Sequence, residues 1–320
     1  MIIGSGRLQP RCRLATAGTF LLNSRESTSF AIHAKPFGAT ELNSSTRSTS
    51  MSLRAIRDLG RAAGGALVFS LPMLMTMELW SLGIYLDRLR LLVLFATALP
   101  LLVALSRYAG FEQTRHWTED AVDALIALGI SGIVCMASLL LFATVTFDTS
   151  FDEVVGKLVI QMVPASIGAL LAKSQFGGSS DEEDDDDADR ETYGGELFLM
   201  AVGALFMGFN VAPTEEMMLI SFQMTEAHAL GLVLASVAVM HCFVFALGFS
   251  GGSEISKDEP WWSPFLRLTL PGYVVAISIS LYLLWLFARL DGLSLGSIVM
   301  ATLVLAFPSA IGAAAARLIL

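Results

Sequence analysis

Charged residues are scarce in this chain, and their scarcity excludes an ordinary water-soluble domain. Asp, Glu, Lys and Arg make up 15% of its 320 residues, whereas roughly 25% is usual in soluble domains. Hydrophobic residues make up 54%. The alternation of apolar and polar residues that is typical of membrane β-barrel strands is also missing. The composition therefore predicts an all-α, polytopic membrane protein that is surrounded by lipid.

Cysteine and histidine are also rare, with three and four residues. Cys12, Cys135 and Cys242 have no paired spacing and so suggest neither a disulfide framework nor a metal site. Zinc-protease, phosphate-loop and dinucleotide motifs are absent. The stretch Gly248-Phe-Ser-Gly-Gly252 matches the hydrolase elbow, but it follows an apolar helix and no histidine comes after it. We expect no enzyme activity, catalytic residue, metal, cofactor or nucleic-acid partner.

The chain does contain apolar runs at intervals of about 20 to 30 residues, long enough for helices that cross a bilayer core of roughly 30 Å. We predict about eight spans, at residues 62–85, 89–105, 121–147, 154–171, 196–222, 228–249, 268–290 and 293–318. Lys and Arg gather at one set of ends, which predicts cytoplasmic termini. The exceptions are Arg88, Arg90, Lys157 and Arg289.

Two segments differ from the apolar runs. Residues 1–50 are rich in Ser, Thr and Arg, as in an organelle transit peptide; the alternative, which we favour, is a disordered tail or a mis-assigned start ahead of Met51. Residues 177–195 hold an acidic tract between glycines, and we predict a flexible acidic linker because dense like charges stay solvated. This linker separates a first half, residues 51–176, from a second half, residues 196–320.

The two halves match one another under a constant shift. The shift that places Thr76 on Thr214 also places Glu78 on Glu216. At a slightly longer offset, a Pro-x-x-Ile-Gly-Ala stretch at Pro164 recurs at Pro308. We interpret the pattern as two tandem four-helix repeats. Because four spans is an even number, both repeats have the same orientation and are related by an axis along the membrane normal.

Carboxylates beside threonines interrupt two of the apolar runs. They occur at Thr76-Met-Glu78 and at Thr214-Glu215-Glu216, where Asn210 and Pro213 come just before. For the segment around Pro213, one interpretation is a broken helix at membrane depth, whose free carbonyls and acids coordinate a cation or relay a proton. In the other, the span ends before Pro213 and the acids lie in the wet first turn of a new helix.

Similar alternatives exist for two further residues. Glu78 lies either within the first span, as we favour, or at the membrane interface after a span that ends near Met75. His241 lies within the sixth span, where it either titrates beside a carboxylate or, as we favour, is a neutral interhelical hydrogen-bonding group.

The leading hypothesis is an ion or proton-coupled transporter, or a channel, with its pathway between the halves. The proposed pathway groups are Glu78, Glu215, Glu216, Thr76, Thr214 and Asn210, with His241 as a secondary candidate. Such oxygen groups suit a small hard cation or a proton. The alternative hypothesis is a non-transporting scaffold or regulator, which predicts exposed or locally hydrogen-bonded glutamates and no polar cavity joining them.

Several stretches together resemble a bacterial family of integral membrane proteins of unknown function. They are Phe69-Ser-Leu-Pro-Met-Leu-Met-Thr-Met-Glu-Leu-Trp80, Tyr193-Gly-Gly-Glu-Leu197, Phe209-Asn-Val-Ala-Pro-Thr-Glu-Glu-Met217 and the segment from Phe307 to Arg317. The resemblance covers about residues 57–320. It implies a multi-pass protein of the bacterial inner membrane, and it implies no activity, substrate or catalytic residue.

Overall fold

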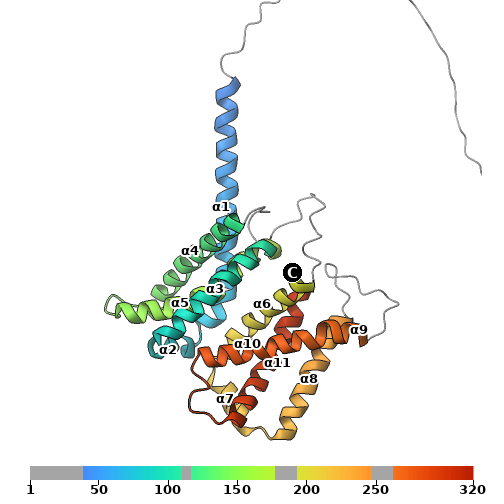
Figure 1. Cartoon of the computed structure of the whole chain (residues 1–320). Helices are drawn as coiled ribbons and strands as arrows, with labels where there is room; N and C mark the ends of the chain where they lie inside the picture. Colours follow the sequence, from blue (N-terminus) through green and yellow to red (C-terminus); the bar gives the residue numbers. More distant parts are fainter. Residues whose placement is uncertain (1–38, 110–116, 177–192, 247–261, 320) are drawn as a thin grey trace, which may run out of the picture. The chain divides into compact units, whose positions relative to one another are not determined.

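The computed structural model describes residues 39–109, 117–176, 193–246 and 262–319 (Figure 1). These residues form helices joined by short turns, and no β-strand occurs among them. The chain divides into two compact units, Met1–Thr49 and Ser50–Leu320. The predicted all-α fold is confirmed for the described part of the chain.

The first half contains five helices among its described residues, and the second half repeats their order. The helices of the first half are α1 (Ala39–Leu74), α2 (Met77–Tyr85), α3 (Arg88–Ala109), α4 (Trp117–Leu141) and α5 (Phe151–Phe176). Those of the second are α6 (Tyr193–Val211), α7 (Glu215–Gln223), α8 (Glu226–Ala246), the short α9 (Trp262–Pro264), the π-helical turn η2 (Phe265–Thr269), α10 (Leu270–Leu286) and α11 (Leu295–Ile319).

Seven of the described helices are long and apolar enough to cross a membrane, and the pair α1 and α2 makes an eighth span if it is counted as one. The prediction of about eight spans is therefore confirmed. Helix α1 begins within the segment for which we predicted disorder, and α6 begins within the predicted linker. A helix already nucleated by an apolar span extends at little cost, because each added residue gains a hydrogen bond. Residues 1–38 and 177–192 lie outside the described part.

Two of the predicted spans are interrupted. Helix α1 stops at Leu74, and α2 continues at an angle of 85° to it. Helix α6 stops at Val211, and α7 begins only at Glu215. Pro213 explains the second break, since proline has no N–H to donate and disfavours helical geometry in the residue before it. We call these two places the helix breaks.

The halves share their geometry at matching residues. Helices α2 and α7 have the same length and begin at residues that the constant shift places on one another. Helices α4 and α10 each end in a turn that contains an alanine with positive φ, at Ala143 (54°) and Ala288 (60°). In both turns the residue after the alanine donates its N–H to the carbonyl five residues earlier.

Glycines allow the closest helix crossing in each half. A Cβ placed on Gly65 of α1 would lie 2.3 Å from the carbonyl oxygen of Gly168 on α5. A Cβ placed on Gly203 of α6 would lie 2.2 Å from the carbonyl oxygen of Gly312 on α11. Only glycine permits backbones to approach this closely, a common device in membrane helix pairs. The first and last spanning helices of each half are therefore locked together at matching positions.

Apolar side chains fill the contact between the halves. Phe69 of α1 and Phe206 of α6 have ring centroids 4.7 Å apart. One continuous cluster of buried apolar residues contains members of both halves, such as Leu102 of α3 and Leu305 of α11. A polar contact is present as well, because the hydroxyls of Thr97 and Tyr282 lie 2.6 Å apart. The halves are thus packed together mainly by hydrocarbon.

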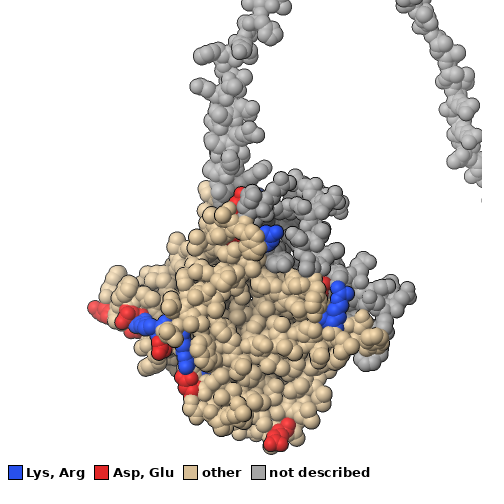
Figure 2. Space-filling model, in the orientation of Figure 1, with Lys and Arg blue, Asp and Glu red and all other residues tan. Residues whose placement is uncertain are grey.

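Charged side chains lie at two opposite edges of the bundle, with a broad uncharged band between them (Figure 2). We call the edge where the helix breaks lie the break end, and the edge where α6 begins and α11 finishes the linker end. Apolar residues of the band are exposed, for example Ile133 (72%) and Leu234 (62%). Such a band is suited to lipid rather than water. The chain is therefore a multi-pass integral membrane protein.

The glycine crossings generate a prediction about stability. Gly65→Ala and Gly203→Ala should each lower the free energy of unfolding by about 1–3 kcal/mol, because the new methyl group overlaps a backbone oxygen. Gly64→Ala is the matched control, since a Cβ on Gly64 meets nothing within 4 Å. Thermal melting in detergent measures the effect. Equal melting temperatures for the Gly65 and Gly64 variants would contradict the close crossing.

Candidate functional site

The helix breaks are stabilised in the same way in both halves. The hydroxyl of Thr76 donates to the carbonyl of Met73 at 2.9 Å, and the hydroxyl of Thr214 donates to the carbonyl of Val211 at 2.8 Å. Each threonine has extended backbone geometry and precedes the first residue of the short helix. Each carbonyl, at the end of the preceding helix, also accepts the backbone N–H of the same threonine, so the hydroxyl adds a second hydrogen bond there. This is the structural role of threonine in the repeated Thr-x-Glu pattern.

The glutamates of the pattern lie at the start of the short helices. Glu78 and Glu216 both occupy the second position of their helix, and Glu215 occupies the first position of α7. Acids are favoured there by the positive end of the helix dipole. Glu78 is half-buried, whereas Glu215 and Glu216 are exposed. The acids thus lie at the break end, in matching places of the two halves.

The remaining predicted residues make local or interhelical hydrogen bonds. The side-chain amide of Asn210 donates to the carbonyl of Phe206, one turn earlier on α6, at 2.8 Å. Nδ1 of His241 on α8 lies 3.0 Å from the hydroxyl of Thr269 in η2. The His241 ring also meets the ring of Phe265 edge-on, with centroids 5.3 Å apart. His241 therefore connects two helices of the second half.

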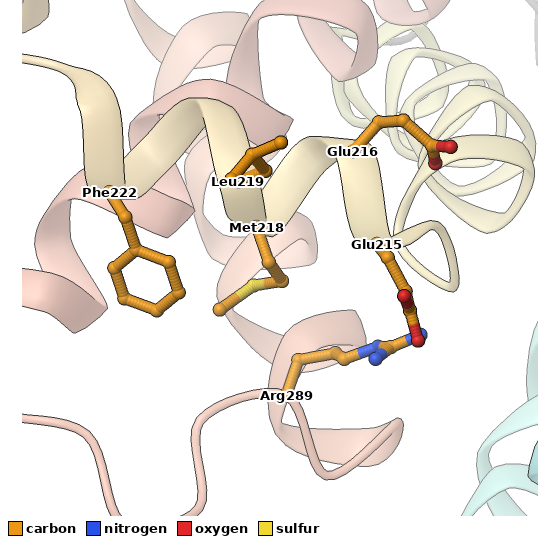
Figure 3. A pocket seen from close by; sticks show the side chains of 6 residues that line it. All are labelled: Glu215, Glu216, Met218, Leu219, Phe222 and Arg289. Atoms are coloured by element: carbon orange, nitrogen blue, oxygen red, sulfur yellow. The ribbon is translucent and has the colours of Figure 1, made fainter.

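An open pocket of about 480 Å³ lies at the second helix break. Its lining consists of Glu215, Glu216, Met218, Leu219, Phe222 and Arg289 (Figure 3). The carboxylate of Glu215 and the guanidinium of Arg289 point toward one another, while Glu216 turns away from Arg289. The pocket therefore has a charged side and an apolar side. Glu78 does not line it.

Arg289 is the residue that the sequence analysis did not connect with this site. It directly follows Ala288, whose positive φ turns the chain back at the end of α10. Its Nη2 donates to the carbonyl of Pro213, within the helix break. The matching positions of the first half hold Met77 in place of Glu215 and Thr144 in place of Arg289. The acid and the arginine are thus both specific to the second half.

The first helix break has a different basic partner close by. Lys157 of α5 is 6% exposed, and its Nζ lies 2.5 Å from Oε1 of Glu153 and 2.7 Å from the carbonyl oxygen of Thr144. Helix α2, which carries Glu78, packs here, since a Cβ on Gly83 would lie 2.6 Å from the backbone nitrogen of Lys157. A buried lysine thus lies directly beneath the short helix of the first break.

The structure does not bring the predicted residues into one pathway between the halves. It places Glu215 and Glu216 together with Arg289 at one break, and Glu78 at the other. Sequence reasoning also missed Gln161, a fully buried residue of α5. The available signal was its position within the apolar run Val159-Ile-Gln-Met-Val163, where a side-chain amide is unusual.

Comparison with known proteins identifies the family. The family model DUF2391, described as "Putative integral membrane protein", matches residues 58–320. The chain belongs to this family. The match begins at Asp58, within α1, and includes both halves and both helix breaks. No curated protein and no solved structure matches the chain. The DUF2391 match thus agrees with the resemblance drawn from the sequence and adds no activity to it.

Arg289 gives a prediction about the second helix break of this DUF2391 member. Arg289→Met should lower the free energy of unfolding by about 1.5–3 kcal/mol, because a charged donor to the Pro213 carbonyl is lost. Arg88→Met is the control, since Arg88 pairs with Asp152 in an exposed setting and such pairs contribute about 0–1 kcal/mol. Thermal unfolding in detergent compares the two. A smaller effect for Arg289 than for Arg88 would contradict a role at the break.

Proposed function

We propose that this protein is a proton- or cation-linked transporter of the bacterial inner membrane, with cytoplasmic termini. One observation carries the proposal. Helix α5, one of the spanning helices, buries the ammonium group of Lys157 and the amide of Gln161. Burying such groups within a bilayer costs several kcal/mol, so they are retained mainly where ions or protons pass.

The acids of the helix breaks have a place in this proposal. Glu78, Glu215 and Glu216 lie at the break end, where they raise the local concentration of cations or protons. Thr76, Thr214 and Asn210 hold the breaks in shape through their hydrogen bonds to backbone carbonyls. In this proposal the glutamates are an access site, and His241 is an interhelical contact away from it.

The distribution of Lys and Arg supports the orientation that we propose, because fewer of them lie at the break end than at the opposite ends of the spans. Four basic residues lie at the break end, against the predicted charge bias. Arg88 pairs with Asp152 at 3.1 Å, Arg90 with Asp291 at 2.8 Å and Lys157 with Glu153 at 2.5 Å, and Arg289 donates to Pro213. Acids contribute little to the positive-inside rule, so the smaller number of Lys and Arg at the break end, rather than their pairing, suits it to the outer face.

We further propose that the two halves arose by duplication and share one orientation. Support comes from the matching glycine crossings, the equal short helices and the alanine turns that end α4 and α10. Helices α1 and α6 both run from the linker end to the break end (Figure 1). Two repeats with this relation have an axis along the membrane normal.

A non-transporting scaffold or regulator is the second candidate function. The observation that favours it is the apolar contact between the halves, where buried residues of both form one cluster. A scaffold requires stable helix packing and an exposed recognition surface, and the pocket at Glu215 and Arg289 offers such a surface. It does not explain why Lys157 and Gln161 are buried in a spanning helix.

Flux in liposomes tests the transport proposal. We expect the purified protein to carry protons or a monovalent cation down a gradient, measured with an internal pH-sensitive or cation-sensitive dye. Glu78→Gln should reduce the rate at least tenfold, because it removes the half-buried acid of the first helix break, on the short helix that packs against Lys157. Glu216→Gln should have a smaller effect, since Glu216 is exposed and lies in the other half.

Glu226→Gln is the matched control for these substitutions. Glu226 is also an exposed acid in the first turn of a helix at the break end, but it belongs neither to a Thr-x-Glu pattern nor to the pocket. Its flux should equal that of the parent. A parent protein that passes neither protons nor any cation tested would favour the scaffold function instead.

A further inference from the structure

We propose that the first half holds internal water at Gln161 and that protons cross the membrane through this half rather than between the halves. The hydrated site is argued from geometry alone. The movement of protons through it rests on the proposed transport function. The site would be a second polar feature of the protein, separate from the open pocket at Arg289.

Gln161 is the centre of the argument. Its exposed fraction is 0%, and within the described part of the chain neither Nε2 nor Oε1 has a hydrogen-bond partner. Buried amides almost always have partners, because leaving one unpaired costs energy that folding does not recover. An amide offers two donors and one acceptor, so its complement must both accept and donate. Water is the smallest molecule that does so, and buried polar groups commonly hold it.

Ser131 of α4 provides a second, independent group of the same kind. It is 0% exposed, and among the described residues its Oγ has no hydrogen-bond partner. Helices α4 and α5 run antiparallel and pack together at this level, since a Cβ on Gly132 would lie 3.0 Å from Sδ of Met162. Ser131 and Gln161 therefore lie within about one turn of each other along the membrane normal.

Polar groups continue from this level to the break end. Cys135 and Ser138 follow Ser131 on the buried face of α4 at helical spacing, and Cys135 shares a hydrogen bond with Ser70 of α1. On α5, Lys157 lies one turn before Gln161 and bonds to Glu153. Helix α2, which carries Glu78, packs against α5 at Lys157. The path from the break end to the middle of the bilayer is thus lined by groups that donate or accept.

Toward the linker end, the first turn of α4 contains the buried residue Asp120. This carboxylate is 0% exposed and lies 3.8 Å from Arg107. Eleven residues separate Asp120 from Ser131, roughly 16 Å along the helix. The buried face of α4 between them carries Ala124, Ala127 and Leu128. The two alanines are the smallest side chains on this stretch of the face.

The second half has the same order of helices but apolar residues at the positions that match these polar groups. At the positions that match Gln161, Ser131 and Lys157, it holds Leu305, Ala276 and Ala301, all 0% exposed. Its buried serines Ser280 and Ser309 lie 3.1 Å apart and are hydrogen-bonded to one another. At these three positions, therefore, the second half is apolar where the first half has an amide, a hydroxyl and an ammonium group.

The chemistry that we assign to this path is proton relay along water. A proton arrives as hydronium near Glu78 and Glu153, and each water that accepts a proton on one side releases another on the opposite side. The proton leaves toward the linker end, where Asp120 and Arg107 lie. Gln161 and Ser131 orient the water and keep their own protons, so no group is consumed.

Radiolytic hydroxyl-radical labelling tests the hydrated site without any need for transport. Radicals formed from trapped water oxidise nearby sulfur, and Cys135 is a fully buried sulfur one turn from Ser131. We expect Cys135 in the full-length protein to be oxidised several-fold faster than the equally buried Met200 and Met240 of the second half. Ser280→Cys places a thiol at the position that matches Cys135, and this thiol should remain unlabelled.

Two substitutions complete the labelling test. Gln161→Leu introduces the residue that the second half holds at the matching position, and Ser131→Ala is a smaller change that serves if the first variant folds poorly. Either should lower the oxidation of Cys135 to the level of Met200. Cys135 oxidation as slow as that of Met200 in the parent, or unchanged in both variants, would overturn the hydrated site.

Proton flux then separates this inference from the proposed function. In liposomes, Gln161→Leu should reduce proton flux at least tenfold, whereas Leu305→Met in the second half should leave it at the parental rate. Flux that is unaffected by Gln161→Leu overturns the path through the first half and leaves the transport function standing. A parent without flux overturns both proton relay and transport, and labelling still decides whether water is held at Gln161.

Discussion

Backbone carbonyl groups at the end of a helix have no partner within that helix and need other hydrogen-bond donors. The two helix breaks meet this requirement with side chains. The hydroxyls of Thr76 and Thr214 bond to carbonyls three residues earlier, and the indole of Trp80 donates to Leu74 at 2.8 Å. Arg289 donates to Pro213. These bonds fix where the short helices begin, and hence where their first-turn glutamates lie.

The same architecture carries different charges in the two halves. Where the second half has Glu215 and Arg289, the first has Met77 and Thr144. The carbonyl of Thr144 accepts a hydrogen bond from Lys157 instead. Each break therefore has one basic side chain bonded to a backbone carbonyl near it, but the arginine comes from the end of α10 and the lysine from α5. Of these two basic residues, Lys157 is the one that lies a single turn from the buried Gln161 on the same helix.

Hydropathy and composition were sufficient to predict the membrane class and the number of spans, whereas the family was predicted from its resemblance to particular sequence stretches. Hydropathy and composition could not show that the first span stops at Leu74, because a break of two residues hardly alters an average over twenty apolar ones. The repeated Thr-x-Glu spacing did mark both breaks, although it left two interpretations open. The contacts of Arg289 and Lys157 depend on how distant helices cross, which the glycine pairs at Gly65 and Gly203 determine only in three dimensions.

The apolar contact between the two halves does not prevent polar side chains from lying inside the first half. The crossing of Gly65 with Gly168 brings the backbones of α1 and α5 into close contact, with Phe69 and Ala172 beside it. Lys157 and Gln161 lie one turn apart on α5, the most buried of the candidate spans. At the positions that match Lys157 and Gln161, helix α11 holds the apolar residues Ala301 and Leu305. The contact between the halves can therefore be apolar while α5 keeps polar side chains inside the first half.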